Sequence, residues 1–144
     1  MAITGSCLCG DVRFEVHGKI SPIGHCHCSK CRKVSGAGSN AVFWAKPDGV
    51  RFVSGEDRIA EFRFEDGWTS SFCQRCGSPT PHANAEGTTW FVPAGLLDDD
   101  PGVRQAVHIH VDSAAPWEEI HGALPRYREG LDSPRIDTDG ADES

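Results

Sequence analysis

The chain has 144 residues, seven cysteines and a formal net charge of −7. This length predicts one domain, and a hydrophobic share of 38% allows one buried core, which excludes a fully disordered chain. No stretch of the sequence approaches the about 20 consecutive apolar residues that a membrane-spanning helix needs. The acidic balance argues against a nucleic-acid partner, and the absence of a secretory signal at the start leads us to expect a cytoplasmic protein.

Short stretches of alternating apolar and polar residues follow one another along the chain, a pattern typical of half-buried strands. The expected strands are 12–16, 41–44, 50–53, 59–64, 69–72, 89–92 and 107–111. Helical signals are short: one turn near 113–116, and one after Cys28 with Ser29 as its cap. The pattern predicts an all-β domain over 1–130. Residues 131–144 are acidic and poor in apolar residues, so we expect a disordered tail.

The cysteines fall into three clusters of short spacing. They are Cys7-x-Cys9, Cys26-x-Cys28-x-x-Cys31 and Cys73-x-x-Cys76. Sulfurs at such spacing can point at one ion, as in the knuckles of zinc ribbons. Gly10 and Gly77 follow the first and last clusters and allow the backbone to turn tightly there. The clusters therefore predict metal binding by thiolates.

Counting the sulfurs suggests how they divide between two sites. The first and last clusters together make a closed four-sulfur set, which is the composition of a structural zinc site. Its members are Cys7, Cys9, Cys73 and Cys76. The middle cluster supplies only Cys26, Cys28 and Cys31, and three ligands with an open position suit a catalytic zinc. We expect two zinc ions per chain, one structural and one catalytic.

Other interpretations of the cysteines compete with this one. Disulfides are disfavoured by the odd number of cysteines and the expected reducing compartment. A thioredoxin-like pair at Cys73 and Cys76 would need a βαβ context that the pattern lacks. The third alternative stays open: His25, His27 or His82 could complete the three-cysteine set and turn it into a second structural site.

The segments around the clusters form a distinctive series. They read GSCLCGDVRF at 5–14, CHCSKCRK at 26–33 and FCQRCGSP at 72–79, followed by VPAGLLD at 92–98, HIHV at 108–111 and APW at 115–117. Over about residues 3–130 the chain thereby resembles the glutathione-dependent formaldehyde-activating enzyme family, which includes centromere-protein-V-like proteins.

The resemblance implies a β-tent fold of small antiparallel sheets related to zinc ribbons. It also implies the same two zinc sites, with the fourth place at the middle cluster open to a thiol or water. The implied activity is condensation of formaldehyde with glutathione to S-hydroxymethylglutathione, a carbon–sulfur lyase reaction. Arg32 and Lys33 directly follow Cys31 and are expected to bind a carboxylate of the thiol substrate.

A second function is compatible with the same residues. No general acid or base other than His25 and His27 is evident beside the middle cluster, and formaldehyde adds to thiols unaided. The alternative is therefore a non-catalytic zinc module that binds or carries glutathione or a protein partner. The sequence leaves the oligomeric state open.

Overall fold

A computed structural model describes residues 2–136 of the chain. It is built of short strands with one α-helix among these residues, so the predicted all-β class is confirmed. The described backbone divides into two compact units. The first unit comprises the chain through Pro22 together with Val42–Arg104, and the second comprises Ile23–Ala41 and the chain from Gln105 onward.

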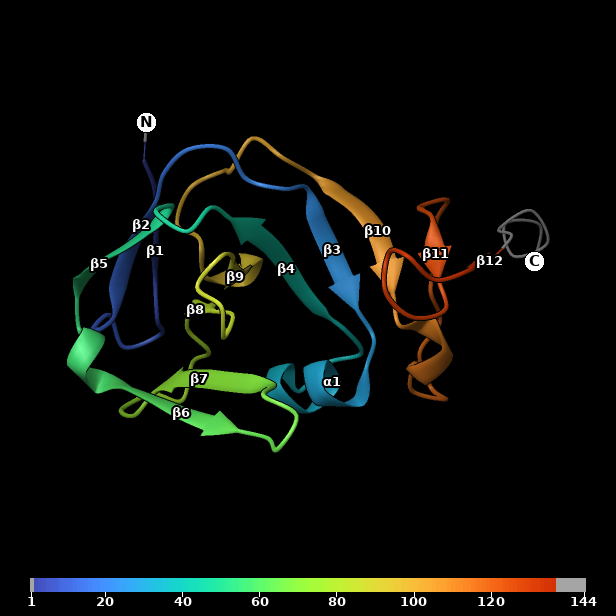
Figure 1. The fold of residues 1–144 in the computed structure, drawn as a ribbon, viewed down its shortest axis with the longest axis horizontal. Helices are drawn as coiled ribbons and strands as arrows, with labels where there is room; N and C mark the ends of the chain where they lie inside the picture. The colour runs from blue at the N-terminus through green and yellow to red at the C-terminus, as the bar shows by residue number, and fades with distance from the viewer. Residues whose placement is uncertain (1, 137–144) are drawn as a thin grey trace. The chain divides into compact units, whose positions relative to one another are not determined.

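The first unit is antiparallel throughout its named strand pairs (Figure 1). Its strands are β1 (Ile3–Ser6), β2 (Arg13–Val16), β4 (Asn40–Ala45, whose first two residues belong to the second unit), β5 (Val50–Ser54), β6 (Ile59–Arg63), β7 (Thr69–Cys73), β8 (His82–Ala83) and β9 (Trp90–Pro93). Strands β1, β2 and β5 form one sheet, β6 and β7 form a hairpin, and β9 pairs with both β4 and β8.

The core of the first unit follows the alternation seen in the sequence. Val12, Phe14 and Val16 are each only 1% exposed, while Arg13 points to solvent. On β4 the neighbours Phe43 and Trp44 point to opposite faces, and only Phe43 is buried. Alternating side chains of a strand face opposite sides of its sheet, so the period-two pattern identified the buried positions correctly.

The second unit holds β3 (Ile23–Cys26), the helix α1 (Ser29–Ser35), β10 (Gln105–Ile109), β11 (Arg126–Tyr127) and β12 (Arg135–Ile136). Strand β10 pairs in parallel with both β3 and β11, and β12 pairs antiparallel with β11 (Figure 1). The family resemblance implied small antiparallel sheets, and the two pairs made by β10 differ from that expectation. Parallel pairing needs a long connection, and the chain between β3 and β10 supplies one.

Three short 3-10 helices complete the described chain: η1 (Glu56–Arg58), η2 (Ala94–Leu96) and η3 (Val111–Ser113). The helical turn expected near 113–116 is thus found slightly earlier, at η3. Residues 131–136 of the expected tail form a turn and β12, while 137–144 lie outside the described residues. Within residues 2–136, no helix is both long enough and apolar enough to cross a membrane.

Gly55 joins β5 to η1 and packs against the backbone of Asp11 and Val12, which directly follow the turn that holds Cys7 and Cys9. Its φ angle is +78°, and a Cβ there would overlap the carbonyl group of Asp11. Gly67 has a similar φ of +91° but open space around it. We therefore expect Gly55→Ala to lower the free energy of unfolding by about 3 kcal/mol or more, and Gly67→Ala by about 1 kcal/mol. Urea unfolding of both variants measures the difference, and equal losses would contradict this packing.

Candidate metal centres

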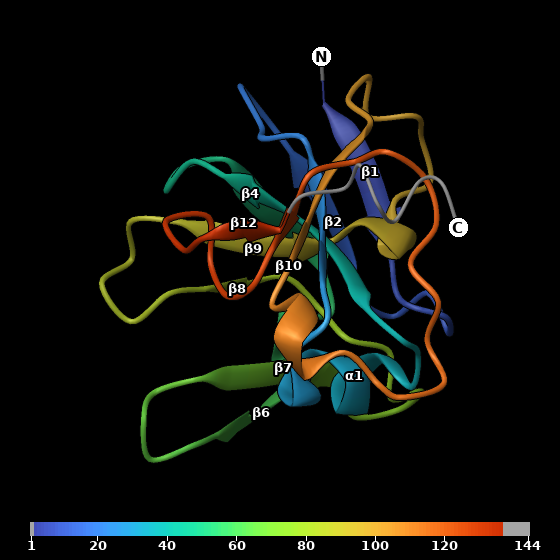
Figure 2. The same ribbon diagram turned by 90° about the vertical axis from the view of Figure 1, so that its right-hand side faces the viewer.

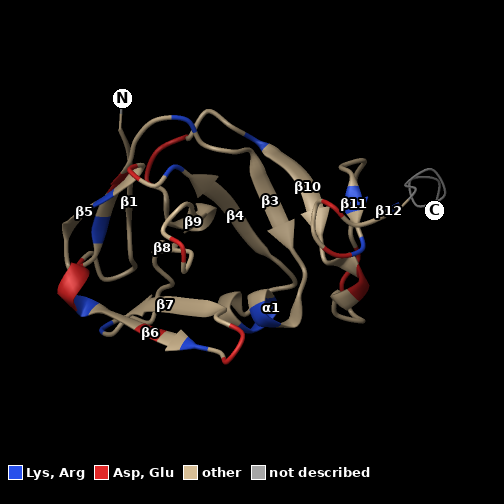
Figure 3. Ribbon diagram, in the orientation of Figure 1, with Lys and Arg blue, Asp and Glu red and all other residues tan. Residues whose placement is uncertain are grey.

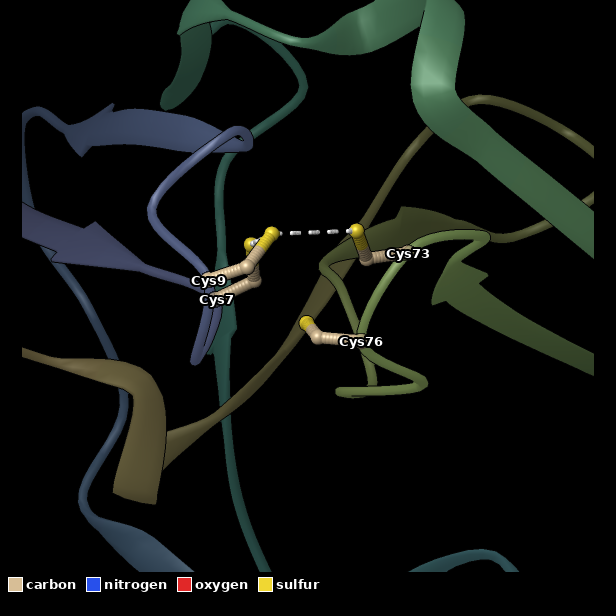
Figure 4. Close-up of side chains that lie close together, drawn as sticks. All are labelled: Cys7, Cys9, Cys73 and Cys76. Atoms are coloured by element: carbon tan, nitrogen blue, oxygen red, sulfur yellow. Dashed lines mark hydrogen bonds between the residues drawn. The ribbon is translucent and has the colours of Figure 1, made fainter.

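The first and last cysteine clusters come together in the first unit. The Sγ atoms of Cys7, Cys9, Cys73 and Cys76 all lie within 4.8 Å of one another and point toward a common centre (Figure 4). The Sγ atoms of Cys7 and Cys9 are 3.5 Å apart, and those of Cys9 and Cys73 are 3.8 Å apart. Four sulfurs about 2.3 Å from one zinc ion would stand about 3.8 Å apart, so this donor set fits a tetrahedral zinc site.

Cys7 and Cys9 lie in the tight turn that joins β1 to β2. The N–H of Gly10 donates to the carbonyl of Cys7 at 3.1 Å, and the N–H of Cys7 donates to the carbonyl of Val12 at 3.0 Å. The N–H of Val12 also donates to the sulfur of Cys7 at 3.3 Å. Gly10 adopts a φ of +83°, which an L-residue rarely takes, so the glycine makes this turn possible.

Cys73 and Cys76 form a second turn of the same kind at the end of β7. The N–H of Gly77 donates to the carbonyl of Cys73 at 2.8 Å, and the N–H of Cys73 donates to the carbonyl of Ser78 at 2.9 Å. Gly77 also has a positive φ, of +78°. Two glycine turns therefore present two sulfurs each, which is the knuckle geometry that the spacing predicts.

The four-cysteine centre is part of the core of the first unit. Cys73 is 0% exposed and Cys7 is 5% exposed, and together with Val12 they pack against Phe52 and Ile59. Because these side chains are buried, the four sulfurs are held inside this core, and a metal ion bound there would contribute to its folding.

Two polar groups adjust the charge at this centre. Hydrogen bonding with the Ser78 hydroxyl, whose Oγ lies 3.3 Å from the sulfur, lowers the pKa of Cys76 to about 5. Arg75 forms an ion pair with Asp11 at 3.1 Å, and the negative charges of Asp11 and then Cys9 raise the pKa of the guanidinium. Arg75 therefore remains cationic beside the four-cysteine centre, where it would offset part of the charge of metal-bound thiolates.

The middle cluster lies in the second unit, where β3 leads into α1. The Sγ atoms of Cys26, Cys28 and Cys31 lie within 4.8 Å of one another. Cys26 ends β3, Cys28 caps the helix, and Cys31 lies in its first turn. The N–H of Cys31 donates to the sulfur of Cys28 at 3.3 Å. The cap expected at Ser29 is thus one residue earlier, because a cysteine sulfur takes the role of the capping oxygen.

The three sulfurs share their protons unequally. Hydrogen bonds from Cys26 and Cys31 lower the pKa of Cys28 to about 2. Hydrogen bonding with Cys28 raises the pKa of Cys26 to about 11, and hydrogen bonding with Cys26 and then Cys28 raises the pKa of Cys31. A bound metal ion would favour the thiolate form of all three.

The histidines beside this cluster have other partners. Nε2 of the buried His27 lies 2.9 Å from Nδ1 of His108. His25 stacks on His108, and its ring nitrogens contact Gln105 and Ser39. Burial lowers the pKa of His27 and, with the charges of His25 and His27, lowers that of His108 to about 4. The remaining candidate, His82, lies on β8 and stacks on Phe91 in the first unit.

The expected carboxylate-binding residues lie on α1, which Figure 3 shows as a basic segment. Arg32 is half-buried, and its Nε is buried without a hydrogen-bond partner among the described residues. Lys33 is exposed. Both side chains belong to the helix that presents Cys31, so they stay close to the three-cysteine cluster by position in the chain.

Several supporting residues were absent from the sequence expectations: Asp11, Arg75, Ser78 and His108. Ser78 and Arg75 lie within two residues of a cysteine in the sequence, and this closeness to a predicted metal ligand was the one feature that could have indicated their role. His108 reaches His27 through the parallel pairing of β10 with β3, across 81 residues of sequence, for which the sequence holds no local signal.

Comparison with known proteins gives a consistent result. A family model described as glutathione-dependent formaldehyde-activating enzyme matches residues 2–113. A protein of Halomonas elongata named "Putative glutathione-dependent formaldehyde-activating enzyme" is 33% identical over 128 residues, which cover 83% of this chain and 82% of that protein. The crystal structure of a Rhodobacter sphaeroides protein is similar in fold, with a TM-score of 0.57 and 24% identity over 72% of this chain and 99% of the other.

Proposed function

Because the chain belongs to the glutathione-dependent formaldehyde-activating enzyme family, we propose that it joins glutathione to formaldehyde to give S-hydroxymethylglutathione, a carbon–sulfur lyase reaction. The observation that carries the proposal is the cluster of Cys26, Cys28 and Cys31. It provides three convergent sulfurs, and the two histidines that flank Cys26 make hydrogen bonds to other side chains.

The proposed metal is zinc at both cysteine centres. A closed set of four thiolates is the composition of a structural site, so we assign that role to the first-unit centre. Three thiolates with an open position are the composition of a reactive site, so we assign that role to the second-unit centre. A bound zinc ion supplies positive charge that keeps a thiolate ionised at neutral pH.

The residues of the second unit would bind and orient the substrate. Cys26, Cys28 and Cys31 supply three of the four ligands that zinc takes, which leaves one place for the thiol of glutathione. Arg32 and Lys33 would bind carboxylates of the tripeptide, because guanidinium and ammonium groups form charge-assisted hydrogen bonds with carboxylates. In the reaction the sulfur forms a bond to the formaldehyde carbon, and the carbonyl oxygen takes the proton that the thiol gives up.

A specific observation favours the alternative of a non-catalytic glutathione-binding module. The hydrogen bonds of the two flanking histidines run to His108, Gln105 and Ser39, and none among the described residues runs from these rings to a cysteine of the cluster. A thiol adds to formaldehyde without a catalyst, so binding alone could be the function of such a site.

The oxidation state of the thiols also bears on location. All seven cysteines are free. Metal-binding thiolates persist in a reducing compartment, and we therefore propose that the protein works in the cytoplasm.

Exchange spectroscopy by NMR tests the proposed activity, since it measures the rate of adduct formation at equilibrium. We expect the zinc-loaded protein to raise the rate with glutathione at least about tenfold above the spontaneous rate. The rate with 2-mercaptoethanol, which lacks carboxylates for Arg32 and Lys33, should rise much less. Glutathione binding with no rate increase would support the binding module instead, and neither binding nor acceleration would contradict both functions.

A further inference from the structure

The outer edge of strand β6 has a defined set of backbone groups available for pairing. In the described part of the chain, β6 and β7 form a two-stranded sheet, and Figure 2 shows them running side by side to their turn. The N–H of Phe64 donates to the carbonyl of Trp68, and that of Gln74 to the carbonyl of Arg58, both at 2.9 Å. Hydrogen-bonded pairs alternate along an antiparallel ladder, so the even-numbered residues of β6 direct their backbone N–H and C=O groups toward β7.

The odd-numbered residues Glu61 and Arg63 therefore direct their backbone N–H and C=O groups away from β7, whereas the N–H of Ile59 donates to the carbonyl of Glu56. The side chains of Glu61 and Arg63 share one face of the hairpin and form an ion pair at 3.5 Å. They are 50% and 54% exposed, which leaves both open to a second partner. In Figure 3 the ribbon of β6 carries both acidic and basic segments.

The opposite face of the same strand is aromatic. Phe62 and Phe64 contact each other with ring centroids 5.1 Å apart, and they are 56% and 41% exposed. Phe64 in turn contacts Trp68 across the turn at 5.7 Å. Aromatic side chains beside an open strand edge can form cross-strand contacts with the aromatic side chains of a strand added at that edge.

We propose that β6 pairs antiparallel with β6 of a second copy of this chain, with Phe62 opposite Phe62 of the second copy. In this register Glu61 lies opposite Arg63 of the second copy, and Arg63 lies opposite its Glu61. Both pairs also exchange backbone hydrogen bonds, because these residues carry the outward-facing groups. The two-fold arrangement places Phe62 and Phe64 of both copies on one continuous face.

The charges select this register over its neighbours. The two nearest registers that join the outward-facing backbone groups are displaced by two residues. A displacement in one direction places Glu61 opposite Glu61 of the second copy, and in the other direction Arg63 opposite Arg63. Like charges directly opposite each other destabilise a sheet, and larger displacements pair β6 with residues outside the strand, so the register with Phe62 opposite Phe62 is favoured.

Sedimentation velocity of the full-length, zinc-loaded protein over a range of concentrations tests the pairing, independently of any catalytic assay. We expect a reversible dimer. Glu61→Arg alone and Arg63→Glu alone should each weaken self-association at least about tenfold, because each change creates two like-charge contacts. An equimolar mixture of the two variants should associate again, since opposite charges then face each other in the mixed dimer.

Glu61→Pro provides a second variant, because it removes an outward-facing N–H that the hairpin itself does not use. It should abolish the dimer while leaving the thermal unfolding midpoint close to that of the wild type. In the wild-type dimer the amide protons of Glu61 and Arg63 should exchange at least about tenfold more slowly than in a dilute monomer. A monomer at every concentration, charge variants that dimerise like the wild type, or a mixture that fails to associate would each overturn the proposal.

Discussion

Replacing Cys73 with alanine will leave most of the chain unfolded at 25 °C. Cys73 is fully buried and lies in one core with Cys7 and Val12. The change therefore removes a proposed zinc ligand and at the same time opens a cavity in the core. Structural zinc contributes about 10–16 kcal/mol to small zinc-binding domains, which equals or exceeds the total stability of about 5–15 kcal/mol of an average domain. Circular dichroism of the purified variant, and of the wild type with a chelator, measures the loss.

The matched control is the same substitution in the other centre. Cys28 is half-buried and lies at the start of α1, where its loss removes a helix cap worth about 1 kcal/mol. The thermal midpoint of Cys28→Ala should therefore fall by only a few degrees. Equal losses of stability in the two alanine variants would contradict the assignment of the four-cysteine centre as the structural one.

The second large effect concerns activity. Cys28→Ser should leave the chain folded, lower its zinc content from two ions to one per chain, and reduce the glutathione-dependent rate to the spontaneous level. Serine keeps an oxygen that can cap α1, but it lacks the thiolate that hydrogen bonds from Cys26 and Cys31 favour at this position. Elemental analysis gives the zinc content, and exchange NMR gives the rate.

Ser29→Ala is the control for this change, because Ser29 is the exposed neighbour of Cys28 and contributes no sulfur. We expect it to retain both zinc ions and the full rate. If Cys28→Ser keeps two zinc ions per chain, or if Ser29→Ala loses as much activity as Cys28→Ser, then the middle cluster is not the reactive centre.

The strands could be predicted where large apolar residues alternate with polar ones. Strand β2 carries Phe14 and Val16 on one face, and its place was identified from that pattern. Strands β1 and β3 were missed, since their sequences ITGS and IGHC each contain a single large aliphatic residue beside glycine. The parallel pairing of β3 with β10 was also missed, because no local property encodes a partner some eighty residues away.

The grouping of the cysteines could be predicted because it depends on counting and on short spacing. The structure brings together the same group of four sulfurs and the same group of three sulfurs that the sequence predicts. Their surroundings depend on tertiary contacts and could not be predicted. Cys28 caps α1 in place of Ser29, and Nε2 of His27 bonds to His108 while its Nδ1 is buried without a hydrogen-bond partner among the described residues.

X-ray absorption at the zinc edge, with and without glutathione, tests the division into a closed and an open centre most directly. Seven cysteines shared by two ions predict an average of about 3.5 sulfur ligands per zinc in the absence of thiol. The average should rise to about 4 when glutathione is added. A histidine signal that accounts for the missing half ligand, unchanged by glutathione, would contradict the open centre and with it the proposed function.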